Sequence, residues 1–358
     1  MSTPRFDWTP FPSAHRRRPW ALPISVLILA GLVVVAVCIG PSGVDVSARD
    51  AFRVIAGHTP WLRSVVAAPA SDIADPIVWD IRLARALVAI LIGSLLAMAG
   101  VALQGLLMNP LADPYTVGVS AGAAVGAALA EVTGFGAMAL GFAGIGTAFA
   151  FGLGAVALVY ALASVSGRVS VHTFLLAGVV VGSMLWSLIP LLMVLARRGE
   201  DLQRVMFYLI GSLQGASWSR AALLLPFAAI SFICLVCWSR DLNLMTLGEE
   251  SAAHLGVEIE PFKRRVLLVG SLATAAAVCV GGIIGFVGLV VPHVARRIVG
   301  PDHRRLLPLA AVFGGILLLA SDLTVRAWLS DMPVGVVTSI VGAPVFCMLL
   351  RRRKSAAW

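Results

Sequence analysis

Long apolar blocks constrain this chain more than any other feature of its sequence. From residue 20 onward they recur at lengths near 20 residues, which is about what an α-helix needs to cross a bilayer, whereas a buried strand needs only about 4 to 8. Hydrophobic residues make up 59% of the 358 positions, charged residues 13%, and the mean hydropathy is +0.95. Since a soluble globule could not bury this much apolar surface, the sequence predicts an all-α polytopic membrane protein.

Charged residues, prolines and polar clusters divide the apolar blocks into about ten predicted transmembrane helices. They lie near 20–40, 83–108, 115–133, 138–163, 173–196, 221–239, 264–284, 286–299, 306–328 and 333–350. The eighth is short for a crossing, and only a glycine-rich turn separates it from the seventh. The residues therefore also allow nine or eleven spans.

A weak internal repeat indicates that the spans form two halves. The second span contains GSLLAMAG at 93–100 and the seventh contains GSLATAAA at 270–277, and each precedes a glycine-rich span that meets a proline. Many transporters consist of two halves with inverted topology. We therefore expect two inverted five-helix halves.

The net charge of +9 comes from arginines and lysines that stand in short runs between apolar blocks. This distribution favours topology signals over nucleic-acid binding. With a cytoplasmic amino terminus, most of the 27 basic residues fall in inner segments, so both termini are predicted to be cytoplasmic. The chain then forms one transmembrane domain over residues 1–358, and three soluble segments are expected: a cytoplasmic tail at 1–19, a periplasmic loop at 41–80 and a cytoplasmic loop at 240–263.

The predicted periplasmic loop contains SARDAFRVIAG, which begins with the capping pattern Ser47-x-x-Asp50. Helical spacing places Phe52, Ile55 and Ala56 on one face. We expect a short helix lying on the membrane surface, with packing of the loop and a binding role equally open.

The predicted cytoplasmic loop contains TLGEESAAHLGVEI. Glu249 and Glu250 would lie in the first turn of a helix, where carboxylates are favourable, and Gly256 would cap its end in a left-handed conformation. A short solvent-facing helix between two spans follows from this pattern.

Candidate catalytic motifs are weak. GVSAG at 118–122 fits the nucleophile-elbow pattern, but no predicted strand precedes it, as an elbow needs. The glycines at 118, 122 and 126 instead have the spacing of close helix packing. The five cysteines lie in apolar runs, the histidines are not spaced as metal ligands, and no phosphate-binding loop motif occurs. We therefore expect no catalytic residue and no metal site, and any ATP would bind another subunit.

Few charges lie within the predicted spans. Asp322 and Arg326 stand at i and i+4 of the ninth span, the spacing of a helical ion pair, and Glu131 lies near the outer end of the third. A structural pair and a functional group facing a cavity both remain open for these side chains.

Six stretches of the sequence resemble the FecCD family, the membrane subunits of ABC importers for ferric siderophores, haem and cobalamin. They are IRLARALVAILIGSLLAMAGVALQGLLMNPLADPYTVGVSAGAAVGA (81–127), LLAGVVVGS (175–183), LIGSLQGASW (209–218), LGEESAAHLGV (247–257), GFVGLVVPHVARRIVGPDHRRLLPLAAVFGG (285–315) and MPVGVVTSIVGAP (332–344). The resemblance covers nearly the whole chain in order.

The resemblance implies a ten-helix permease in the bacterial inner membrane that forms a homodimer. Its implied partners are two ATP-binding cassette ATPase subunits, which would hold ATP and Mg, a periplasmic substrate-binding protein and membrane lipid. The permease itself would bind no cofactor and no nucleic acid.

The resemblance also implies three sets of site residues. The cytoplasmic gate would consist of Asn109, Leu111, Ser170 and Val171, although relatives carry a hydroxyl residue where Val171 stands. The helix that couples to the ATPase would contain Leu247, Gly248, Glu249, Glu250, Ala253, Leu255 and Gly256. Acidic residues of the binding protein would dock at Arg82, Arg85 and Arg326.

Together these features predict an importer permease without its own ATPase activity, with a ferric siderophore favoured over haem and cobalamin as cargo. The alternatives are an ion-coupled secondary transporter, for which Asp322 and Glu131 are the candidate carboxylates, and an intramembrane hydrolase at Ser120.

Overall fold

The computed structural model describes residues 18–40, 46–58, 74–135, 141–165, 168–196, 199–329 and 332–353. Most of the predicted tail at 1–19 and parts of the predicted periplasmic loop, 41–45 and 59–73, lie outside the described residues. The described chain is almost entirely helical, as predicted. Its strands are β1 (Ser164–Val165) and β2 (Arg168–Val169), which form a short antiparallel hairpin.

The first part of the chain contains α1 (Ala21–Cys38), α2 (Ala48–His58), α3 (Ala74–Pro76), the π-helical η1 (Ile77–Leu83), α4 (Ala84–Leu106), the 3₁₀-helical η2 (Pro114–Val117), α5 (Val119–Val132), α6 (Phe142–Ala163) and α7 (Val171–Leu195). The second part contains α8 (Gly199–Ile210), α9 (Trp218–Cys237), α10 (Ser239–Met245), α11 (Glu249–His254), α12 (Ile259–Gly281), α13 (Val287–Val299), α14 (His303–Trp328) and α15 (Val334–Arg353).

Seven helices in the described part of the chain are long and apolar enough to cross a membrane. They are α1, the continuous segment from α3 to α4, α6, α7, α9, α12 and α14. The remaining predicted spans correspond to α5, α13 and α15, whose apolar helical stretches are shorter. The predicted helical membrane protein is thus confirmed, whereas the number of crossings is supported by length for seven of the ten.

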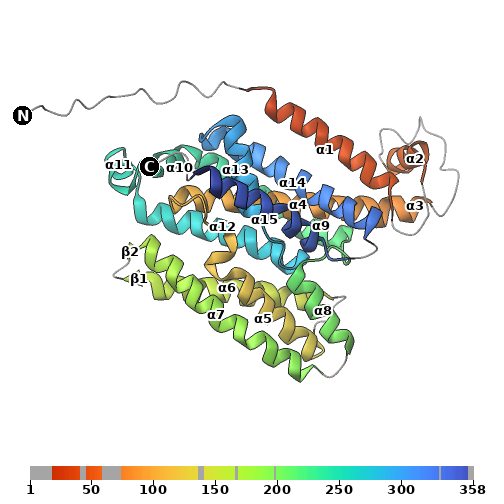
Figure 1. The fold of residues 1–358 in the computed structure, drawn as a ribbon, viewed down its shortest axis with the longest axis horizontal. Coiled ribbons are helices and arrows are strands. Elements are labelled where there is room, and N and C mark those ends of the chain that lie inside the picture. The colour runs from red at the N-terminus through yellow and green to blue at the C-terminus, as the bar shows by residue number, and fades with distance from the viewer. Residues whose placement is uncertain are drawn as a thin grey trace, which may run out of the picture.

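Helix α4 is the centre of the fold. In its segment 83% of the most apolar window is buried, compared with 22% in α1 and in α7. Helices α9, α12, α13 and α14 pack around α4, while α5, α6, α7 and α8 form a second group beside them (Figure 1). Figure 1 also places α10, α11 and the β hairpin at one end of the bundle and α2 and α3 at the other.

Glycines allow the central helices to approach closely. A Cβ atom at Gly93 would overlap the carbonyl oxygen of Gly314, and one at Gly100 would overlap the carbonyl oxygen of Gly288. In a bilayer, where water does not drive apolar faces together, such backbone contact is a main source of helix association. The prediction that glycines of the GVSAG region serve packing is confirmed at Gly122, which faces the backbone of α6 at Phe151.

Two long helices are each followed by an irregular turn and a short helix. After α4 the chain turns through η2 into α5, and after α12 it turns through residues 282–286 into α13. Met108 and Phe286, both with positive φ, mark these turns. The similar pattern agrees with two related halves, and their inverted arrangement stays a prediction.

Helix α2 occurs where the periplasmic loop predicted it, and its cap is confirmed because the backbone amide of Asp50 donates to Ser47 Oγ at 3.1 Å. Of the side chains predicted to share one face, Phe52 is 59% exposed and Ala56 is buried, and Ala51 and Val54 are buried as well. The position of this helix on the membrane surface stays a prediction. The side chains that α2 buries pack on Val37 and Val78, contacts that the local sequence does not contain.

Candidate functional site

Residues 109–114, with the sequence NPLADP, follow the second apolar span and form a tight turn. The backbone amide of Leu111 donates to Asn109 Oδ1 at 3.0 Å, and the amide of Tyr115 donates to Asp113 Oδ1 at 3.0 Å. Asn and Asp commonly stabilise turns in this way, and Pro114 begins the 3₁₀ helix that follows. The turn leaves the apolar side chains of Met108 and Leu111 about half exposed.

A second candidate gate segment lies where β2 leads into α7. Ser170 occupies the N-cap position of α7 with an extended backbone and makes no capping bond through its side chain. Its side chain is exposed, and that of Val171 is partly buried. The β hairpin that precedes these residues lies at the end of the bundle that carries α11 (Figure 1).

The second candidate gate segment lines a pocket of about 740 Å³ together with the residues that directly precede the first. Its lining includes Met108, directly before the turn at 109–114, and Ser170 and Val171. The predicted gate residues Asn109 and Leu111 are not among its lining residues. Sequence reasoning missed Met108 because its apolar side chain reads as the end of a span; its left-handed backbone, with φ of 48°, turns the chain.

The same pocket is lined by residues of the predicted coupling region, namely Glu249 of α11 and Glu260 and Lys263 of α12. Helix α11 begins after Gly248, whose φ is 102°, and carries Glu249 and Glu250 in its first turn. The structure thus brings the start of the predicted coupling helix next to the second candidate gate segment.

The predicted cap of α11 is confirmed. Gly256 has a φ of 90°, its amide donates to Ala253 O at 3.0 Å, and the amide of Val257 donates to Ala252 O at 3.0 Å. This is the Schellman arrangement, which favours glycine at the left-handed position. Leu247 and Leu255 on either side of the helix are 62% and 54% exposed, which leaves an apolar surface at this end of the bundle.

A polar junction that sequence reasoning missed joins α10 to the start of α14. Asn243 Nδ2 donates to Asp302 Oδ1 at 2.8 Å, and the backbone amide of His303 donates to Asn243 Oδ1 at 2.9 Å. Burial raises the pKa of Asp302, but the hydrogen bonds from Asn243 and the Arg304 backbone and the charges of Arg304 and Arg305 outweigh it and lower this pKa. Asn243 and Asp302 are 59 positions apart, so local spacing could not have indicated this junction.

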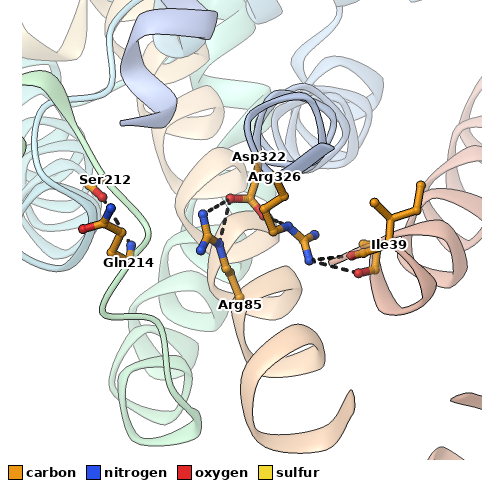
Figure 2. A network of polar contacts seen from close by, with 7 residues as sticks. Ile39, Arg85, Ser212, Gln214, Asp322 and Arg326 are labelled. Carbon is orange, nitrogen blue, oxygen red and sulfur yellow. Dashed lines mark hydrogen bonds and ion pairs between the residues drawn. The ribbon is translucent and has the colours of Figure 1, made fainter. Parts of the chain in front are cut away.

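At the opposite end of the bundle, Asp322 lies between two arginines (Figure 2). Arg85 Nε donates to Asp322 Oδ1 at 2.8 Å, and Arg326 Nε lies 3.0 Å from Asp322 Oδ2 as an ion pair without hydrogen-bond geometry. The carboxylate is completely buried. The predicted pair between Asp322 and Arg326 is confirmed, and Arg85 is a second partner that comes from α4.

Arg82 and Arg326 also complete the end of α1. Their guanidinium groups donate to four carbonyl oxygens that have no partner within that helix, those of Ala36, Val37, Cys38 and Ile39. Cations at a helix carboxyl terminus also oppose its dipole favourably. The side chains of Arg82 and Arg326 are consequently buried, and that of Arg85 is 12% exposed.

The other predicted intramembrane carboxylate, Glu131, lies 3.5 Å from Arg204 of α8 at a more exposed site. Among the described residues there is no group of three or more His, Cys, Asp or Glu side chains that could hold a metal ion. Ser120 of the GVSAG motif is buried in α5.

The chain is similar to known proteins both in sequence and in fold. The sequence pattern of the FecCD transport family matches residues 26–352. The chain is 40% identical over 346 residues to the cobalamin import system permease protein of Halobacterium salinarum, covering 95% of this chain and 92% of the relative. It is 38% identical over 287 residues to the hemin transport system permease protein of Yersinia pestis, covering 77% and 84%.

A solved structure described as an inward-facing conformation of a metal-chelate type ABC transporter superposes with a TM-score of 0.80 at 28% identity. The match covers 93% of this chain and 99% of that one. Family pattern, relatives and fold all agree over nearly the full length. This chain is therefore a member of the FecCD transport family, a multi-pass permease subunit of an ABC importer and not itself an ATPase.

Proposed function

We propose that this permease moves a metal chelate across the inner membrane. The sequence favours a ferric siderophore, while the two relatives named above are a cobalamin and a hemin permease, so haem and cobalamin are equally to be tested. One observation carries the proposal: the second candidate gate segment, Met108 and the predicted coupling helix line a common pocket, which is what an importer that converts ATP-driven motion into gating requires.

The partners are a second copy of this chain, two ATPase subunits and a periplasmic binding protein, with both termini in the cytoplasm. The exposed leucines Leu247 and Leu255 beside α11 offer an apolar surface for an ATPase. Helix α7 is only 22% buried and exposes large apolar side chains such as Leu176 and Val180, which supports lipid or a second subunit on that face.

Docking of the binding protein at Arg82, Arg85 and Arg326 stays a prediction. Their contacts within the subunit give all three arginines a structural role. The side chain of Arg85 is 12% exposed, and those of Arg82 and Arg326 are buried. A docking role would therefore act through the shape and positive field of this end of the bundle more than through free side chains.

An ion-coupled secondary transporter receives no support from the candidate carboxylates. Asp322 is neutralised by two arginines, and Glu131 is paired with Arg204. These pairs within the subunit account for both carboxylates without a coupling ion.

Uptake into proteoliposomes tests the proposal. The permease, copurified with its ATPase subunits, is expected to import one of ferric siderophore, hemin or cyanocobalamin only when ATP is inside and the loaded binding protein outside. Uptake driven by a proton or sodium gradient in vesicles that lack the ATPase would instead establish the secondary transporter.

The exposed Leu111 supports a prediction for the gate. Leu111→Ala is expected to raise ATP-independent leak of the cargo about tenfold, because an apolar constriction excludes water and solutes only while it is filled. Leu176→Ala, which shortens another exposed leucine, on α7, serves as the control. If both variants leak at the wild-type rate, Leu111 has no sealing role.

A further inference from the structure

Lys263 is an almost completely buried lysine near the start of α12, with 4% of its side chain exposed. Its ammonium group carries three protons and has three acceptors on three different elements. These are Glu249 Oε2 of α11 at 2.6 Å, Glu260 Oε1 of α12 at 3.3 Å and Val169 O of β2 at 3.1 Å. Every donor of the lysine is thus used.

Glu260 completes the contact with β2. The backbone amide of Val169 donates to Glu260 Oε2 at 3.0 Å, while its carbonyl accepts from Lys263. Both backbone polar groups of Val169 are therefore held by one pair of side chains from α12. Val169 directly precedes Ser170, the candidate gate residue at the N-cap position of α7.

We propose that Lys263 is a positioning residue that ties the second gate segment to the coupling helix, so that movement of α11 is passed to the start of α7. The inference rests on the proposed function, since it needs an ATPase that moves α11. It concerns a residue outside the predicted gate and coupling sets, and it joins one set to the other.

The energetics favour a firm connection. Lysine is almost never fully buried unless it is paired, so Lys263 depends on its two carboxylate partners. A displacement of Glu249 that left the ammonium group in place would break one of these pairs. Strand β2 has only two residues and pairs with one other strand of two residues, so few bonds of the hairpin oppose a displacement of β2 by Lys263.

The neighbouring basic residue provides a matched control. Arg265 lies on the same turn of α12, is 50% exposed and is 3.8 Å from Glu258, which is 78% exposed. Loss of a cation at this position removes the same charge from the same helix but touches neither α11 nor β2.

The experiment follows the gate directly and needs no cargo. Ser170→Cys is introduced into a chain whose five native cysteines are replaced by alanine, and the permease is reconstituted with its ATPase subunits. The rate at which a maleimide labels Cys at position 170 is measured with and without ATP and vanadate. Lys263→Met, Glu249→Gln, their combination, Lys263→Arg and Arg265→Met are compared in this background.

The ATP-dependent change in labelling rate is expected to shrink about tenfold in Lys263→Met and in Glu249→Gln, while ATP hydrolysis continues. The double variant should be no worse than Lys263→Met, and Lys263→Arg, which keeps the charge and the donors, should retain most of the change. Arg265→Met should behave as the parent does.

A full ATP-dependent change in both Lys263→Met and Glu249→Gln would overturn the inference. So would losses of hydrolysis and of the labelling change in equal proportion, because they would report a general structural defect. If Lys263→Met does not fold, Glu249→Gln decides the outcome alone, since its side chain is 37% exposed. Failure of the proposed function would appear separately, as absence of ATP-dependent cargo uptake in the unmodified permease.

Discussion

Replacing Gly100 with leucine is expected to abolish accumulation of folded permease. A Cβ at this position of α4 would overlap the carbonyl oxygen of Gly288, a backbone atom that no side-chain rotation can move aside. Since α4 is the central helix, separating it from α13 would disturb the surrounding packing. The free energy of unfolding is expected to fall by more than about 4 kcal/mol. The measurement is the yield of monodisperse permease by size-exclusion chromatography after detergent extraction.

Gly31→Leu is the matched control, because Gly31 also lies inside a transmembrane helix but a Cβ there would meet no atom within 4 Å. Its yield should equal that of the parent. Normal yield and melting temperature of Gly100→Leu would show that α4 and α13 can separate without loss of the fold.

The second large effect is expected for Asp322→Ala. This change leaves the guanidinium groups of Arg85 and Arg326 in a buried site without their shared carboxylate, and removing one partner of a buried ion pair costs about 3–5 kcal/mol. The melting temperature of the purified permease should fall by several degrees, and α1 should become more accessible to protease because Arg326 also holds its last carbonyl groups.

Glu131→Ala removes a carboxylate from the more exposed pair with Arg204, where about 0–1 kcal/mol is expected. The comparison therefore separates buried from exposed pairing in the same subunit. Equal melting temperatures of the two variants would mean that Asp322 contributes no more than a surface charge.

Local elements were predictable wherever neighbouring residues determine the conformation. Helix α11, the predicted coupling helix, is an example: an acidic first turn and a glycine at the left-handed cap are both encoded within a few positions, and both occur in the structure. The cap of α2 at Ser47 and the turn at Asn109 have the same local origin.

Pairing between distant segments was predictable only in part. The i, i+4 spacing indicated the pair between Asp322 and Arg326, but Arg85 is 237 positions from Asp322 and entered the cluster through the packing of α4 on α14. Lys263 likewise reaches Val169 across 94 positions. The sequence spacing of residues this far apart does not predict that they are in contact.

The sequence by itself determined that this protein is helical and membrane-spanning, because apolar blocks of bilayer length and the basic runs between them act through the solvent and need no tertiary partner. It also determined the short capped helices, which depend on nearby residues. Only the tertiary structure decided which charges are paired, which face of α2 is buried and that the candidate gate residues Ser170 and Val171 share a pocket with α11. Those features depend on how helices far apart in sequence pack, and the close approach of their glycine backbones is a property of two surfaces together.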